Sequence, residues 1–182
     1  MLELRKFGRS DFDRLISWVP DARFLMRWAG PIFTWPLDKA QLGKHLEDAK
    51  GKKPKRYAFK AVRISDNKAI GHVEVDFIDY NKSSGVLSRV LIGNPEERGR
   101  GYGAKMIKLA VDFGFNKISL GRIHLAVFDF NKPAISCYKK IGFRKYDFKR
   151  EHNLEEEPQV KFEDEYWKLI YMKLRKEDYL SG

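Results

Sequence analysis

The chain has 182 residues, of which 43% are hydrophobic and 14% aromatic, and its formal net charge is +11. This composition excludes a disordered or fibrous chain, and the length predicts one domain, residues 1–182, with a sizeable core. The start of the chain is charged and no apolar run approaches the roughly 18 residues of a membrane span, so we expect a cytoplasmic protein without a membrane partner.

The excess positive charge is spread along the chain rather than gathered in one arm. Basic chains attract nucleic acids and phosphorylated cofactors alike, but no zinc finger or RNA-binding signature is present, which makes nucleic acid an improbable partner. A single cysteine, Cys137, cannot form an internal disulfide. No Cys/His cluster has the spacing of a zinc site, and we expect no bound metal.

The first half of the chain predicts one strand, three helices and a meander of three strands. Ser10 and Asp38 each open a helix with a capping-box pattern, and the later segments change to the alternating period of strands. The predicted elements are a strand over 2–7, helices from Ser10, over about 21–28 and from Asp38, and strands over 57–64, 68–79 and 85–93.

The second half predicts a strand–helix–strand crossover with further helices and strands around it. The strand over 122–130 is almost wholly apolar, as expected for a strand covered on both faces. The other predicted elements are helices over 102–118 and 131–142, and strands over 143–151 and 165–174, with a polar connection over 153–164. The order predicts a mixed α/β protein with a sheet of about seven strands.

Three glycines on alternate residues, with two arginines among them, lie at 98–103 between a strand and a helix. Glycine allows a ligand to approach the backbone closely, and the first amides of a helix favour an anion. The Gly-Lys-Ser/Thr of a P-loop is absent, and a dinucleotide fold would have its glycines after the first strand. The segment therefore predicts a phosphate site, with a flexible turn as the alternative.

Two motifs carry a resemblance to a known family. The pattern Arg98-x-x-Gly101-x-Gly103 resembles the acetyl-CoA signature of the GNAT (Gcn5-related N-acetyltransferase) superfamily. Residues 131–143, "NKPAISCYKKIGF", resemble the second motif of that family at the expected spacing. The N-terminal half is most similar to the branch of ribosomal-protein N-acetyltransferases. The resemblance implies the GNAT fold, with a mostly antiparallel mixed sheet, a splayed middle and flanking helices.

The resemblance also implies acetyl-CoA as co-substrate and names the residues that hold it. The pantetheine arm would lie along the strand before the loop, and the backbone amide near Leu91 would polarise the thioester carbonyl. Asn131 would cap its helix, bind the pantetheine arm, or both. The complete set of implied cofactor-binding residues is Val90, Leu91, Ile92, Arg98, Gly99, Arg100, Gly101, Tyr102, Gly103, Ala104 and Asn131.

Two residues are candidates for proton transfer. Tyr138 would protonate the leaving CoA thiolate if the resemblance holds, and is otherwise a core residue. Glu74 alternates with His72 and Asp76 on one strand face, which is either an exposed polar face or an acidic wall for a cationic amine. In the second case Glu74 would be the general base, directly or through water. Many family members carry a glutamate near the position of Ser88, which leaves the base open.

The predicted function is direct transfer of an acetyl group from acetyl-CoA to a primary amine in a ternary complex. The acceptor could be a protein N-terminus, a polyamine, an amino sugar or an aminoglycoside. A non-catalytic acyl-CoA-binding or sensing module is the alternative from another class. We expect a monomer or a homodimer.

Overall fold

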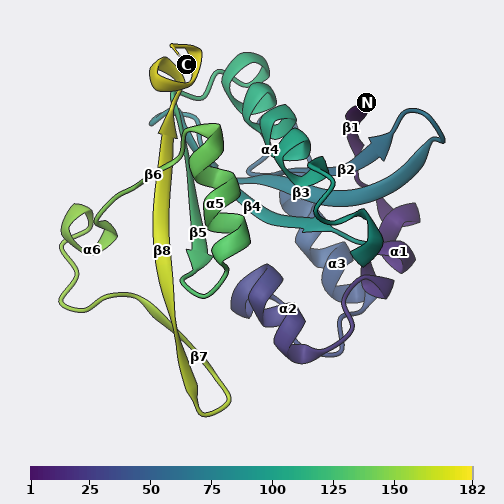
Figure 1. Ribbon diagram of the computed structural model, residues 1–182, viewed down its shortest axis with the longest axis horizontal. Helices are drawn as coiled ribbons and strands as arrows, with labels where there is room; N and C mark the ends of the chain where they lie inside the picture. The colour runs from purple at the N-terminus through teal and green to yellow at the C-terminus, as the bar shows by residue number, and fades with distance from the viewer. Residues whose placement is uncertain (182) are drawn as a thin grey trace.

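The computed structural model describes residues 1–181, which form a central sheet flanked by helices (Figure 1). The sheet has eight strands, and the prediction of about seven fell one short because β7 was assigned to a polar connection. The strands are β1 (Leu2–Lys6), β2 (Tyr57–Arg63), β3 (Lys68–Asp79), β4 (Ser84–Ile92), β5 (Arg122–Phe128), β6 (Arg144–Lys145), β7 (Gln159–Phe162) and β8 (Glu165–Arg175).

Seven α-helices occur in the described part of the chain, joined by short 3₁₀ segments and one π-helical turn. They are α1 (Phe12–Ser17), α2 (Ala22–Ala29), α3 (Lys39–His45), α4 (Tyr102–Asp112), α5 (Lys132–Ile141), α6 (Phe148–Glu151) and α7 (Lys176–Leu180). Among residues 1–181, no helix is both long enough and apolar enough to cross a membrane.

The strand order is β1-β2-β3-β4-β5-β8-β6, with β7 paired to β8. All neighbours are antiparallel except β4 and β5, which are parallel and pair only over Ser84–Val86 and Arg122–His124. Beyond Val86 the two strands diverge, so the edge of β4 that faces β5 is free of strand partners up to Ile92. The sheet is therefore splayed in the middle, as the family resemblance predicted.

Two hydrophobic cores lie on the two faces of the sheet. The larger core joins the apolar stripes of α4 and α5 to strand residues such as Val75 and Leu87. The smaller core joins α1, α2 and α3 to residues such as Ala58 and Leu91. In Figure 1, α4 and α5 lie in front of the sheet and α3 lies behind it.

A β-bulge interrupts β4 at Arg89. His72 is opposite Leu91 while Glu74 is opposite Ser88, so two residues of β4 face the single residue Val73 of β3. Arg89 has a φ of 49°, a left-handed conformation that is strained for a residue with a long side chain. The bulge lies in the part of β4 that is no longer paired with β5.

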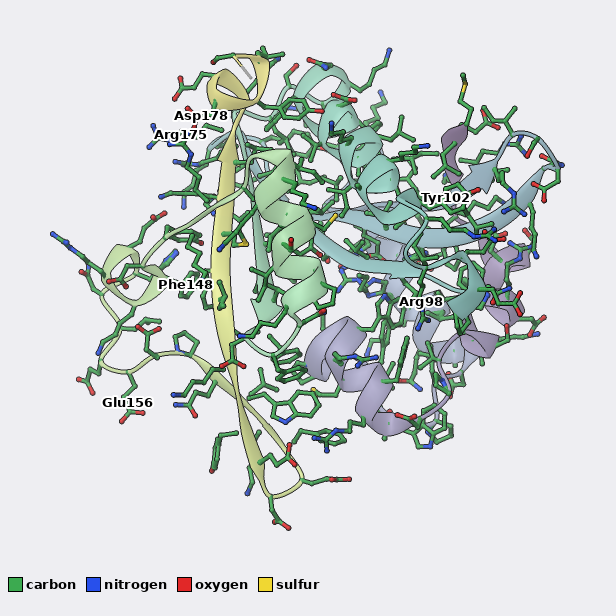
Figure 2. The ribbon with its side chains drawn as sticks, in the orientation of Figure 1. Arg98, Tyr102, Phe148, Glu156, Arg175 and Asp178 are labelled. Carbon is green, nitrogen blue, oxygen red and sulfur yellow. The ribbon has the colours of Figure 1, made fainter. Side chains whose placement is uncertain are left out.

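The predicted mixed α/β fold is confirmed, whereas one predicted strand is wrong. Residues 143–151 form only the two-residue β6 and then the helix α6. Asp147 accepts a hydrogen bond from the backbone N–H of Arg150 and so caps a helical turn. That turn stacks the ring of Phe148 on Tyr171 of β8, with centroids 3.9 Å apart, where Figure 2 labels Phe148 beside the strand. The polar connection expected over 153–164 also contains β7.

Candidate active site

A cavity of about 620 Å³ lies beside the open edge of β4, between that strand, β5, α2, α4 and α5. Its wall includes Ile107 and Tyr138 on the α4 and α5 face of the sheet. It also includes Ala29 and Pro31 on the α2 side. The divergence of β4 from β5 thus opens a passage from one face of the sheet to the other.

The glycine loop before α4 owes its shape to backbone freedom rather than to tight packing. Gly99 and Gly101 have φ values of +76° and +79°, and a Cβ built on either would meet nothing within 4 Å. Residues with a side chain rarely adopt such angles. The loop can therefore present its backbone to a ligand without a side chain in the way.

The first turn of α4 follows this loop directly. The backbone N–H of Lys105 donates to the carbonyl oxygen of Gly101 at 3.2 Å and closes the turn. The amides of Tyr102, Gly103 and Ala104 precede this first intrahelical bond, and such amides are available to an anion at the positive end of the helix dipole. Gly103 also lines the cavity, so the phosphate-binding geometry opens into it.

Two arginines, Arg27 of α2 and Arg98 of the loop, supply positive charge at this end of the cavity. Arg98 Nε and Nη2 donate to the carbonyl oxygens of Ile92 and Gly93 at 3.0 and 3.1 Å, which fixes the guanidinium between the loop and α2 (Figure 2). Burial, together with the like charge of Arg27 on α2, lowers the pKa of Arg98. Neither arginine forms an ion pair with any residue in the described range 1–181. Two unneutralised cations side by side favour an anionic ligand.

Arg100 is placed differently. Its guanidinium is mostly exposed and lies 3.4 Å from Glu97, a buried carboxylate that also binds Arg63 at 2.7 Å. Arg100 therefore contributes to the electrostatic surroundings of the loop and does not line the cavity.

The structure brings most of the predicted cofactor residues together. Those in the cavity wall are Val90, Leu91, Ile92, Arg98, Gly103 and Asn131. The others, Gly99, Arg100, Gly101, Tyr102 and Ala104, form the adjoining loop and first helical turn. The wall also contains Tyr138 but not Glu74.

Asn131 and Tyr138 face the cavity from opposite ends of α5. The Asn131 side chain accepts from the backbone N–H of Ala134 at 3.4 Å, which is long for such a bond, so the cap is weak. Tyr138 is buried, and this burial raises the pKa of its phenol well above the ordinary value of 10. Cys137 also lines the cavity, and burial raises the pKa of its thiol. A thiol of raised pKa is a poor nucleophile at neutral pH.

Neither of the two environments expected for Glu74 is observed. Glu74 is only 2% accessible. The strand face that carries it is therefore neither exposed to solvent nor an open acidic wall. Arg89 Nε donates to Glu74 Oε2 at 2.7 Å, and the ring nitrogens Nε2 of His45 and His72 lie 3.0 and 2.9 Å from its carboxylate oxygens. Asp76 is likewise bound by Arg89 and by Arg56, the latter at 3.0 Å.

This buried cluster sets the basicity of Glu74. Burial alone would raise the pKa of Glu74, but the charge of Arg89 and the hydrogen bonds from His45 and His72 outweigh it, so the pKa lies well below its ordinary value. A carboxylate so stabilised is a weak base. The role of Glu74 as general base stays a prediction, in the indirect form only, because its carboxylate is outside the cavity wall.

Three residues of the site were missed from the sequence: Arg27, Arg56 and Arg89. A signal for two of them was present, because buried carboxylates such as Glu74 and Asp76 require cationic partners. The sequence does not show that this strand face is buried, since its alternation is typical both of an exposed polar face and of an acidic wall.

The fold, the open strand edge and the phosphate loop together define an acetyltransferase of the GNAT type. The family model described as "Acetyltransferase (GNAT) domain" matches residues 1–144, and the chain belongs to this family. The predicted class, an acetyl-CoA-dependent N-acetyltransferase, is confirmed.

Individual relatives agree with this assignment. The chain is 30% identical over 143 residues to spermidine N(1)-acetyltransferase of Escherichia coli (strain K12), covering 78% of this chain and 72% of that protein. It is also 30% identical over 81 residues to the uncharacterized N-acetyltransferase YokL of Bacillus subtilis (strain 168), covering 44% of this chain and 45% of that protein. The crystal structure of spermidine N-acetyltransferase from Vibrio cholerae, in complex with CoA and spermine, has the same fold. Its TM-score is 0.81 at 21% identity, with 98% of both chains covered.

Proposed function

We propose that the protein transfers the acetyl group of acetyl-CoA directly to a primary amine within a ternary complex. The observation that carries this proposal is the passage through the splayed sheet. It joins the start of α4 to the free edge of β4, and its wall has residues from both faces of the sheet. A donor and an acceptor can therefore meet from opposite sides.

The phosphate end of acetyl-CoA fits the start of α4. The amides of Tyr102, Gly103 and Ala104 would bind the pyrophosphate, and Arg27 and Arg98 would add charge. The amide-rich pantetheine arm fits the unpaired edge of β4 beyond Val86, where Val90 to Ile92 line the cavity. The arm would take the place of a strand there.

Tyr138 is proposed as the donor to the sulfur of the leaving group. Its raised pKa keeps the phenol protonated at neutral pH. Because an ordinary thiol, with a pKa of about 8.5, is the stronger acid, the phenol serves best as a hydrogen-bond donor to the developing thiolate. Complete proton transfer is favoured only where burial also raises the pKa of the CoA thiol.

The amine must lose a proton before it attacks, and we propose an indirect route for it. Ser88 is directly opposite Glu74 in the β3–β4 ladder and lines the cavity. Side chains so placed have Cβ atoms roughly 4.5–5.5 Å apart. The Ser88 hydroxyl makes no hydrogen bond to Glu74 in the structure, so the relay would need that hydroxyl to turn toward the carboxylate when the amine binds. The low pKa of Glu74 makes this route a slow one.

Two acceptors are kept as candidates. A protein N-terminal amine follows from the resemblance of the N-terminal half to ribosomal-protein N-acetyltransferases. A polyamine follows from the similarity to the E. coli enzyme, whose name gives spermidine as its substrate.

The proposal is tested by release of free CoA thiol from acetyl-CoA in the presence of different amines. The panel contains spermidine, an aminoglycoside, amino acids and peptides with varied first residues. Thiol release that depends on one class of amine, with the acetylated product seen by mass spectrometry, is the expected result. Binding of acetyl-CoA by calorimetry without transfer to any amine would favour the sensing module instead.

A further inference from the structure

The strand register separates the cavity into a donor half and an acceptor half. Val75 and Leu87 are paired and belong to the core under α4, where the donor is expected. Val86 and Ser88 pair with Asp76 and Glu74, so they lie on the other face of the sheet. Residues of the cavity wall on that second face would surround the acceptor.

The acceptor half contains no carboxylate. Within residues 1–181, the only charged side chains that line the cavity are Arg27, Arg89 and Arg98, all of them cations. Glu74 and Asp76 lie on the acceptor face, but Arg56 and Arg89 engage them and they are absent from the wall. A polyamine would bring two or more ammonium groups into a site without an opposing charge, which is costly once water is displaced.

The same half is apolar. Val127 and Ile170 are paired and lie in or against the core under α4, so their neighbours Phe128 and Leu169, also paired, lie on the acceptor face. The cavity wall contains both of these residues, and also Ile32, Phe77 and Val160. Ile32 and Phe77 are large apolar side chains, and they are 45% and 62% exposed. Neither belongs to a hydrophobic core. Exposed apolar residues at the mouth of a cavity are typical of a ligand-binding rim.

One polar group is left for the amine. Ser88 Oγ is buried and has no hydrogen-bond partner among the described residues. A buried hydroxyl without a partner is uncommon, and Ser88 belongs to the cavity wall. A hydroxyl can accept hydrogen bonds from an amine, but it carries no charge that could neutralise several ammonium groups.

We infer that the acceptor is a primary amine carried on an apolar group with no second positive charge, and that polyamines are poor substrates. This inference rests on the proposed function and specifies its acceptor. Two kinds of acceptor have this chemistry: a peptide N-terminus with an apolar first side chain, and a small arylalkylamine. Comparison of a leucine peptide with phenethylamine distinguishes them.

The first experiment compares kcat/KM for four acceptors on the wild-type protein: spermidine, phenethylamine, and two tripeptides that begin with leucine or lysine and are otherwise identical. We expect at least a tenfold preference for an apolar acceptor over spermidine, and for the leucine peptide over the lysine peptide. Activity with both apolar acceptors would mean that the amine and its apolar group suffice. Activity with the leucine peptide alone would assign the peptide backbone a part in recognition.

The second experiment places a carboxylate at the rim. Phe77→Glu should lower kcat/KM for the apolar acceptors and raise it for spermidine, each by at least fivefold. Phe77→Gln controls for loss of the ring without added charge and should not raise the spermidine value. Ile64→Glu introduces the same charge at a 48% exposed residue outside the cavity wall and should leave both values unchanged.

Two results would overturn the inference. Equal or greater kcat/KM for spermidine in the wild type would reject it while leaving the proposed acetyl transfer intact. Thiol release with none of the amines would also reject it, and calorimetry with acetyl-CoA then shows whether the donor site fails as well.

Discussion

At the scale of single residues, Tyr138 combines burial with a position in the cavity wall. A buried tyrosine on a helix can equally be a core residue, and its ring does pack edge to face on Phe143. The hydroxyl group distinguishes the two roles, because packing needs only the ring whereas a hydrogen bond to the leaving thiolate needs the phenol O–H.

Tyr138→Phe is therefore expected to lower kcat while leaving the Kd for acetyl-CoA unchanged. The loss should be on the order of 10²-fold, the lower end for removal of one hydrogen-bond donor to a developing negative charge. Stopped-flow thiol release and calorimetry measure the two quantities. Tyr179→Phe is the matched control, since that phenol donates to Asp112 at 3.0 Å outside the cavity wall. A Tyr138→Phe variant with unchanged kcat would leave the residue a structural role only.

At the scale of elements, the start of α4 has the backbone geometry that the glycine pattern predicted, and phosphate binding there stays a prediction. The left-handed Gly101 directly precedes the helix, so the loop delivers its backbone amides to one end of the cavity. A side chain there would meet no neighbouring atom, and the effect of a substitution would come from backbone strain and from charge.

Gly101→Glu should abolish measurable binding of acetyl-CoA, because it puts a negative charge where the pyrophosphate belongs. Gly101→Ala should weaken binding far less, and should destabilise the fold by about 1–2 kcal/mol through the left-handed conformation. Gly51→Glu provides the control: Gly51 has a φ of +89° and open space around its Cβ, but it lies between α3 and β2, away from the loop that opens α4. If Gly51→Glu reduced acetyl-CoA binding as strongly as Gly101→Glu, the site would be elsewhere.

Local patterns predicted this part of the molecule well because they act over a few residues. The glycines at 99–103, the cap at Asn131 and the alternation of β3 each depend on near neighbours in the chain. The bulge at Arg89 and the helix α6 do not. Arg89 is held by carboxylates on another strand, and Phe148 stacks on Tyr171, so long-range contacts decide both conformations. The environment of Glu74 could not be predicted for the same reason, since His45 of α3 and Arg56, just before β2, contact its carboxylate.

At the scale of the whole molecule, the buried cluster links segments that are distant in sequence. His45 is the last residue of α3, Arg56 precedes β2, Glu74 and Asp76 belong to β3, and Arg89 belongs to β4. The two carboxylates and two guanidinium groups cancel in charge, and the contacts among them tie the bulge of β4 to the rest of the sheet.

Glu74→Gln should destabilise the fold at pH 7 by about 3–5 kcal/mol, because it leaves the buried guanidinium groups of Arg56 and Arg89 with the single carboxylate of Asp76. The folded-state pKa of Glu74 lies well below 4.5, so its contribution is complete above about pH 4.5 and is lost as the pH falls through the folded-state value. Urea unfolding at pH 7 and at successively lower pH measures both effects. The wild type should lose stability below pH 4.5 more steeply than the variant, and Glu156→Gln, an exposed control, should behave as the wild type.

The same cancellation of charge limits which substitutions the four buried charged positions can accept. Replacement of any one of Arg56, Glu74, Asp76 or Arg89 by a neutral residue leaves an odd charge in the interior, whereas exchange of an oppositely charged pair for apolar residues keeps the sum at zero. Viable changes at these four positions should therefore arise in pairs. A library that randomises all four together should return folded members in which acidic and basic residues are gained or lost in equal number.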